Sequence, residues 1–167
     1  MKENSQKVIN FRNFVFGVED SLVSTVGLLS GIASASVPKG TIFLTGVILI
    51  LVEAISMAAG SFLSERSTED LEAQHEVSPR KSIIGSITMF FSYLIAGIIP
   101  LLPYSFLEIS LALPLSILFT LIALFVLGLF SAKISHTPIL KSAIRMLVIA
   151  GIAILVGVIV GKIFNHI

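Results

Sequence analysis

Long apolar stretches separated by short polar ones dominate the sequence. Each apolar stretch exceeds the about 20 residues that a helix needs to cross about 30 Å of hydrocarbon. Runs of this length indicate helices rather than a barrel. We therefore predict an all-α, polytopic membrane protein whose five transmembrane helices form one domain over residues 1–167. The predicted helices cover about residues 14–37, 41–64, 82–103, 107–133 and 140–164.

Composition strengthens this interpretation and excludes several classes of function. Hydrophobic residues make up 55% of the chain and charged residues only 13%, whereas soluble proteins carry about 25% charged residues. A net charge of +1 points to no nucleic-acid partner, and the absence of cysteine excludes disulfides and thiolate metal sites. No nucleophile–base pair or phosphate-binding loop is visible. We therefore expect neither an enzyme nor a resident cofactor.

Basic residues lie mainly on one side of the predicted topology. Of the eleven Lys and Arg residues, only Lys39 and Lys162 fall on the side opposite the N-terminus. Cytoplasmic loops carry an excess of Lys and Arg, so we predict that the N-terminus and the polar loop 65–81 are cytoplasmic. The C-terminus is then on the opposite side. With no transit peptide visible, the expected location is a prokaryotic plasma membrane, or a vacuolar-type membrane in a eukaryote.

Acidic residues inside the predicted helices are the main candidates for function. Glu19 and Asp20 lie in the first apolar stretch, and Glu53 lies in the second, one helical turn before Met57. A charged residue at the centre of a membrane helix costs at least about 2.5–3.5 kcal/mol and usually marks a site or an ion path. Helical rise places Asp20 about 9 Å from the cytoplasmic surface and Glu53 about 16 Å from it.

No Lys or Arg lies deep enough in the predicted helices to neutralise these carboxylates, Arg145 being the nearest. The carboxylates must then be protonated, hydrated or paired with a mobile cation. A divalent ion balances two carboxylates, and protons can replace the ion when it leaves. Carboxylates suit several divalent metals, and the softer thioether of Met57 would favour a transition metal. Packing is the other interpretation of Met57.

Four further acidic residues follow the second helix. They are spaced four, three and four residues apart, so they form one stripe if the helix continues beyond the membrane. One interpretation is a solvated helix face, and the other is a vestibule that gathers cations before they enter. The residues are Glu65, Glu69, Glu72 and Glu76.

Small residues recur at four-residue spacing in three of the predicted helices. Such patterns let two helix backbones approach closely in a membrane. We therefore predict close helix packing at Gly27-x-x-x-Gly31, Gly60-x-x-x-Ser64 and Gly157-x-x-x-Gly161.

Two motifs carry a resemblance to a known family. Gly17-Val-Glu-Asp-Ser-Leu-Val-Ser-Thr-Val-Gly-Leu-Leu-Ser-Gly31 and Glu53-Ala-Ile-Ser-Met-Ala-Ala-Gly-Ser-Phe-Leu-Ser64 resemble the first and second helix signatures of the vacuolar iron transporter family. The resemblance implies five membrane helices, a homodimer with an ion path between its subunits, and export of Fe²⁺, often also Mn²⁺, in exchange for protons. Asp20 and Met57 match the aspartate and methionine of these signatures.

The chain differs from the family pattern in four places. Ser21, Leu49 and Ser61 stand where the pattern has a glycine and two glutamates, and Glu53 lies one turn beyond Leu49. The long cytoplasmic metal-binding domain of many members is reduced here to residues 65–81. The chain thus resembles a short form of the family.

Three functional hypotheses follow. The first is proton-coupled export of Fe²⁺ or Mn²⁺ from the cytosol, with Asp20, Glu53 and Met57 binding the metal and with Glu19 and the acidic stripe as further candidates. The second is a membrane scaffold or assembly protein that keeps the fold without transport. The third is a proton or small-cation channel.

Overall fold

The protein is a bundle of long helices with short connections. The computed structural model describes residues 2–73 and 80–165. This part of the chain forms five helices, each long and apolar enough to cross a membrane, which confirms the predicted all-α membrane architecture. The helices are α1 (Lys2–Ser34), α2 (Lys39–Ala73), α3 (Arg80–Phe106), α4 (Ile109–Ser135) and α5 (Ile139–Phe164).

Two of the helices are longer than the apolar stretches that predicted them. Helix α1 begins at Lys2 instead of residue 14, and α2 continues to Ala73 instead of ending at residue 64. Much of the predicted loop 65–81 is therefore helical. The polar residues in these extensions form helices as readily as apolar ones, so hydropathy marks where a helix leaves the membrane but not where the helix ends.

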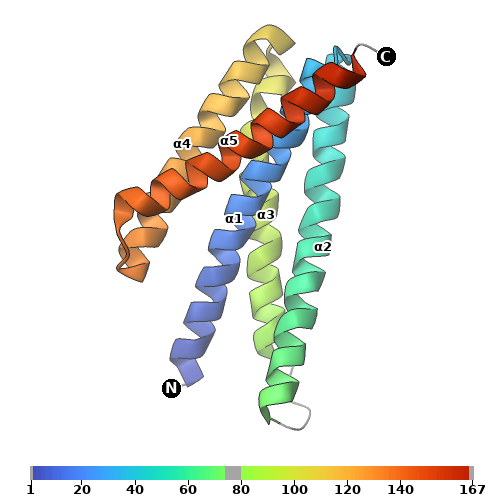
Figure 1. Ribbon diagram of the computed structural model, residues 1–167. Coiled ribbons are helices and arrows are strands. Elements are labelled where there is room, and N and C mark those ends of the chain that lie inside the picture. The colour runs from blue at the N-terminus through green and yellow to red at the C-terminus, as the bar shows by residue number, and fades with distance from the viewer. Residues whose placement is uncertain (1, 74–79, 166–167) are drawn as a thin grey trace.

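The helices run up and down with α1 and α3 at the centre of the bundle (Figure 1). Helix α1 packs mainly against α3 and α5, while α2 packs mainly against α3. Although α1 and α2 are joined by a short turn, they contact each other less than either contacts α3. The two helices that carry the candidate acidic residues are thus held in place by α3.

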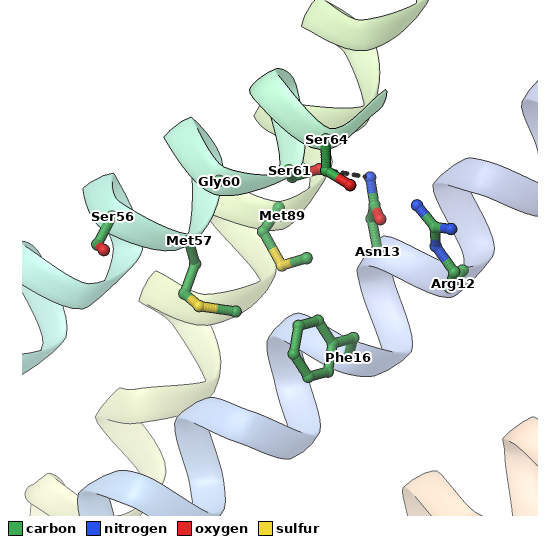
Figure 2. Close-up of a pocket in the computed structure, with 9 residues that line it drawn as sticks. All are labelled: Arg12, Asn13, Phe16, Ser56, Met57, Gly60, Ser61, Ser64 and Met89. Carbon is green, nitrogen blue, oxygen red and sulfur yellow. Dashed lines mark hydrogen bonds between the residues drawn. The ribbon is translucent and has the colours of Figure 1, made fainter. Parts of the chain in front are cut away.

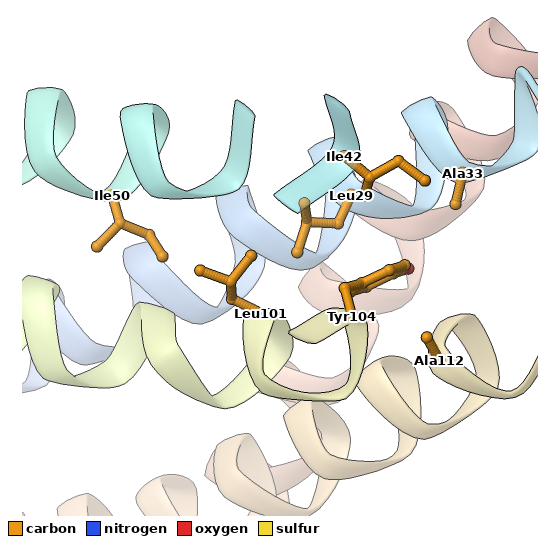
Figure 3. Close-up of a cluster of buried hydrophobic side chains, with 7 residues drawn as sticks. All are labelled: Leu29, Ala33, Ile42, Ile50, Leu101, Tyr104 and Ala112. Atoms are coloured by element: carbon orange, nitrogen blue, oxygen red, sulfur yellow. The ribbon is translucent and has the colours of Figure 1, made fainter. Parts of the chain in front are cut away.

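A cluster of buried apolar side chains closes the end of the bundle near the α1–α2 and α3–α4 turns. Its largest members come from α1, α2 and α3 and are Leu29, Ile42, Ile50, Leu101 and Tyr104 (Figure 3). A second cluster, centred on Leu22, joins α1, α3, α4 and α5. The described side chains that are fully buried also include hydroxyls, whereas large apolar side chains are exposed along every helix. This distribution fits a lipid environment, because no water drives apolar side chains inward there.

Glycines allow α1 and α5 to cross at close range. A Cβ atom on Gly157 would overlap the carbonyl oxygen of Gly27, and one on Gly161 would overlap that of Gly31. The close packing predicted at Gly27-x-x-x-Gly31 and at Gly157-x-x-x-Gly161 is therefore confirmed, and the two patterns pack against each other. Gly60 differs, because a Cβ placed there meets no atom of the described chain within 4 Å. The close packing predicted at Gly60-x-x-x-Ser64 is therefore not found at Gly60 within the described chain.

Candidate metal-ion site

Asp20 and Glu53 approach each other across the gap between α1 and α2. Both side chains are partly buried, and their carboxyl groups lie within electrostatic range of each other. Among the described residues, neither carboxyl group forms a hydrogen bond or an ion pair. The structure therefore brings together two like charges from different helices without a basic partner. Such a pair is stabilised by a cation or by a shared proton.

Tyr93 of α3 lies beside this acidic pair and ties α3 to α1. Its side chain is fully buried, its hydroxyl lies 2.7 Å from the Ser24 hydroxyl, and its backbone carbonyl accepts a 2.7 Å hydrogen bond from Ser21. Tyr93 is within electrostatic range of both Asp20 and Glu53. The serine that replaces glycine after Asp20 thus has a structural role, since its hydroxyl fastens the Asp20 turn of α1 to α3.

Glu19 has a different environment from its neighbour. It lies within electrostatic range of Asp20 and also of Arg145 on α5. Arg145 is the residue that the sequence indicated as the nearest basic group. Because a basic group lies within electrostatic range of Glu19, whereas Asp20 is within range of the acidic Glu53, the two adjacent carboxyl groups are not equivalent. Of the two, Asp20 is the better candidate for a mobile cation.

Met57 lines a cavity of about 730 Å³ bounded by α1, α2 and α3. Figure 2 shows its side chain extending from α2 toward this space, with Phe16 of α1 opposite and Met89 of α3 beside it. Asn13 and Ser61 border the same cavity. Asp20 and Glu53 do not line it, although Glu53 is one turn from Met57 on the same face of α2. Met57 therefore lines the cavity at a position one turn of α2 away from Glu53.

Glu65 is buried, with only 6% of its surface exposed. Its Oε1 atom accepts hydrogen bonds from the Asn13 amide at 2.5 Å and from the Ser61 hydroxyl at 3.1 Å, and the Arg12 guanidinium lies 3.5 Å away. The Oε2 atom has no hydrogen-bond partner among the residues that the structure describes. It lies against Gly85 of α3, where a Cβ would overlap the carboxyl group. The interpretation of Glu65 as part of a solvated helix face is therefore wrong: its side chain joins α2 to α1.

The rest of the acidic stripe is described only in part. Helix α2 continues past Glu69 and Glu72, as the stripe requires, while Glu76 lies outside the described residues. In the part of the chain that the structure covers, no group of three or more His, Cys, Asp or Glu side chains could hold a metal ion. The described part of a single chain therefore presents a pair of carboxyl groups rather than a group of three such ligands.

Three residues beside the site were not expected to belong to it: Asn13, Met89 and Tyr93. The sequence indicated a role for Asn13 only weakly, because Asn13 is the last polar residue before the first apolar stretch. It gave no indication for Met89 or Tyr93, since both belong to an ordinary apolar stretch. Only the packing of α3 against α1 and α2 brings them to the cavity and to the acidic pair.

Five helices that are long and apolar enough to span a membrane define a class, the polytopic helical membrane proteins. Sequence comparison identifies the family within this class. The chain belongs to the VIT family, which matches residues 11–84 and 72–162.

Named relatives agree with this assignment. The chain is 29% identical over 151 residues to vacuolar iron transporter homolog 4 of Arabidopsis thaliana, covering 82% of this chain and 75% of the relative. It is 22% identical over 215 residues to vacuolar iron transporter 1 of the same plant, covering 93% of this chain and 86% of the relative. The corresponding values for vacuolar iron transporter 1 of Tulipa gesneriana are 23% over 202 residues, 85% and 82%.

Proposed function

We propose that the protein exports Fe²⁺, Mn²⁺ or both from the cytosol in exchange for protons. The observation that carries this proposal is the Asp20–Glu53 pair, whose carboxyl groups lie within electrostatic range of each other with no hydrogen bond or ion pair to the described residues. Two carboxylates match the charge of one divalent metal ion, and protons restore neutrality after the ion leaves. The names of the relatives, which are iron transporters, support a metal as cargo.

The charge asymmetry of the chain supports an orientation that fits export from the cytosol. The start of α1, the end of α2 and the start of α3 lie at one end of the bundle (Figure 1). The side of the predicted topology that includes this end carries nine of the eleven Lys and Arg residues, which favours a cytoplasmic location for it. The cavity beside Met57 lies on the Arg12 and Glu65 side of the acidic pair. It is therefore a suitable entrance for cytosolic metal.

We further propose that two copies of the chain form a homodimer with the ion path between α1 and α2 of both subunits. One described chain offers no group of three acidic or imidazole ligands, whereas two chains would bring together two copies of Asp20 and Glu53. The open surface at Gly60 supports α2 as part of the interface, because small residues favour close helix contacts in membranes.

Transport by the purified protein in sealed vesicles tests the function. With an acidic vesicle lumen, the parent should accumulate Fe²⁺ or Mn²⁺ inside and release protons outward. The Asp20→Asn and Glu53→Gln variants should lose this uptake by at least about tenfold, the lower range for groups around a metal. Glu108→Gln is the matched control, because Glu108 is an exposed carboxylate at the start of α4. Parental uptake by both site variants would refute the assignment.

A non-transporting scaffold is the second candidate, favoured by the incomplete ligand set of the described single chain. Equilibrium binding separates the two functions. The transporter proposal requires Mn²⁺ binding that is lost in Asp20→Asn, whereas a scaffold would show no binding that depends on Asp20. A cation channel would differ from the transporter in its ion flux. That flux would rise with ion concentration without saturation and would not be coupled to protons.

A further inference from the structure

A polar cavity of about 270 Å³ lies where α5 begins. The turn between α4 and α5, which forms one wall of it, lies at the outer edge of the bundle (Figure 1). Among the residues that the structure describes, its lining offers two cationic side chains and two hydroxyl groups but no carboxylate. The chemistry of this cavity therefore fits an anion. The lining residues are Thr137, Pro138, Lys141, Ser142 and Arg145.

The two cations of the cavity have no acidic counterpart on their own hairpin. All ten Asp and Glu residues of the chain lie at or before Glu108, so neither α4 nor α5 carries a carboxylate. Lys133 in the last turn of α4 adds a third positive charge. Among the described residues, neither Lys141 nor Arg145 forms an ion pair or a side-chain hydrogen bond, although Glu19 of α1 lies within electrostatic range of Arg145. The hairpin thus keeps an excess of positive charge at this end.

The start of α5 adds to the attraction for an anion. Its first turn contains no acidic residue, and no side chain caps it at Pro138. The first N–H groups of a helix lack partners within the helix and carry a partial positive charge. The ammonium group of Lys141 lies at the same end, where it raises the positive potential further.

Aromatic contacts place the cavity at the boundary between the polar and apolar parts of the bundle. The ring centroid of Phe130, one turn before the end of α4, lies 6.3 Å from the centroids of Phe11 and Phe14. Phe14 begins the first apolar stretch of the sequence, and the residues before it are mainly polar. The α4–α5 turn therefore lies near the level of the membrane surface, on the side predicted to be cytoplasmic.

The outer face of α5 changes from basic to apolar with distance from the cavity. Lys141, Val148 and Ile152 lie on one face of the helix. Val148 is 54% exposed and Ile152 is 58% exposed, so beyond the cavity this face fits lipid chains rather than water. A molecule with an anionic head and apolar tails matches both parts of the face, whereas inorganic phosphate matches only the first part.

We propose that this cavity binds the phosphate group of an anionic phospholipid, with Lys141 and Arg145 as its cationic partners and the Ser142 hydroxyl as a hydrogen-bond donor. Basic pockets between membrane helices on the cytoplasmic side are typical sites for anionic headgroups. The bound lipid holds the α4–α5 hairpin at the membrane surface. Because α5 packs extensively against α1, the same lipid stabilises the position of α1.

Lipid binding to the purified protein in detergent micelles tests the proposal, with native mass spectrometry to measure bound lipid. Dioleoyl phosphatidylglycerol should bind at least about fivefold more tightly than dioleoyl phosphatidylcholine, which has the same chains and a phosphate but no net charge. Lys141→Gln and Arg145→Gln should each weaken binding of phosphatidylglycerol about fivefold, the contribution expected of one basic residue near an anionic headgroup. Lys162→Gln is the matched control, because it removes the same charge at the opposite end of α5.

Competition with inorganic phosphate separates the two sources of the anion. Phosphate at the same concentration as phosphatidylglycerol should not displace the lipid. Displacement would assign the cavity to a free anion and overturn the lipid proposal. The proposal is also overturned if Lys141→Gln and Arg145→Gln keep the parental preference for phosphatidylglycerol, or if Lys162→Gln weakens binding as much as they do.

Acetylation of lysines in the unaltered protein keeps the test valid if a variant fails to fold. Lys141 and Lys162 are both exposed, so a water-soluble acetylating reagent reaches both. Phosphatidylglycerol should slow the acetylation of Lys141 about fivefold relative to phosphatidylcholine and leave that of Lys162 unchanged. Equal rates at Lys141 in the two lipids would exclude the site. Neither measurement involves transport, so the outcome is independent of the proposed function.

Discussion

At the scale of single residues, the buried carboxyl group of Glu65 shows how polar groups hold this bundle together. Its Oε1 atom accepts hydrogen bonds from Asn13 and Ser61 and lies near Arg12, so it joins α2 to α1 where these helices otherwise have few contacts. Asn13 is only 2% exposed, so its amide group cannot form hydrogen bonds with water in place of Glu65. The contact therefore fastens the two helices beside the entrance of the cavity.

Replacing Glu65 with alanine should destabilise the protein. The change removes the charged acceptor of a buried amide, which costs about 1–3 kcal/mol of the free energy of unfolding. Unfolding in mixed detergent micelles, followed by circular dichroism, measures the loss. Glu108→Ala, at an exposed carboxylate, should change stability by less than about 0.5 kcal/mol. A Glu65→Ala variant as stable as the parent would mean that desolvation of the carboxylate cancels its hydrogen bonds.

At the scale of helices, the crossing of α1 and α5 depends on the absence of side chains. Gly27 and Gly31 of α1 meet Gly157 and Gly161 of α5 so closely that a methyl group would overlap a carbonyl oxygen of the other helix. In a membrane, dispersion contacts and close approach replace the hydrophobic effect as the source of helix association. The position of α1, and with it that of Asp20, therefore depends on this contact.

A Gly157→Ala change tests that dependence. The added methyl group should force the helices apart and lower the free energy of unfolding by about 1–3 kcal/mol. Gly151→Ala on the same helix is the matched control, because a Cβ there meets no described atom within 4 Å. It should cause no loss, since alanine is the better helix former. Equal melting temperatures for Gly157→Ala and the parent, measured in detergent, would contradict the role assigned to the crossing.

At the scale of the whole molecule, the proposed function depends on a second copy of the chain. The described ends of the chain lie at opposite ends of the bundle (Figure 1), as expected for an odd number of spans. Linking two copies head to tail would therefore require an additional span. Co-expression of two differently tagged chains, purified through both tags, gives mixed dimers without this problem.

Mixed dimers with one parental subunit and one Asp20→Asn subunit should transport at much less than half of the parental rate. The reason is that a shared path needs the carboxylates of both subunits. Vesicle uptake of Mn²⁺ measures the rate, and a mixed dimer of parent and Glu108→Gln is the control. Half of the parental rate would indicate a separate path in each subunit, and failure to recover any doubly tagged complex would contradict the dimer.

The order of apolar and polar residues was sufficient to predict the class of the protein. Five runs of spanning length lead to five helices because a membrane accepts hardly any other backbone structure. The same reasoning selected Asp20 and Glu53 as candidates for function, since a carboxylate in hydrocarbon is costly. The close contacts of Gly31 and Gly157 followed from their four-residue spacing. Each of these inferences depends on the local sequence alone.

Only the tertiary structure decided which helices meet. It placed α3 between α1 and α2, turned the carboxyl group of Glu65 inward, gave Glu19 a basic counterpart in Arg145, and brought Met89 to the cavity of Met57. In lipid every face of an apolar helix is equally soluble, so periodicity does not reveal the face that packs against a neighbour. The pairing of helices depends on the fit of side chains far apart in the chain, and that fit exists only in the folded bundle.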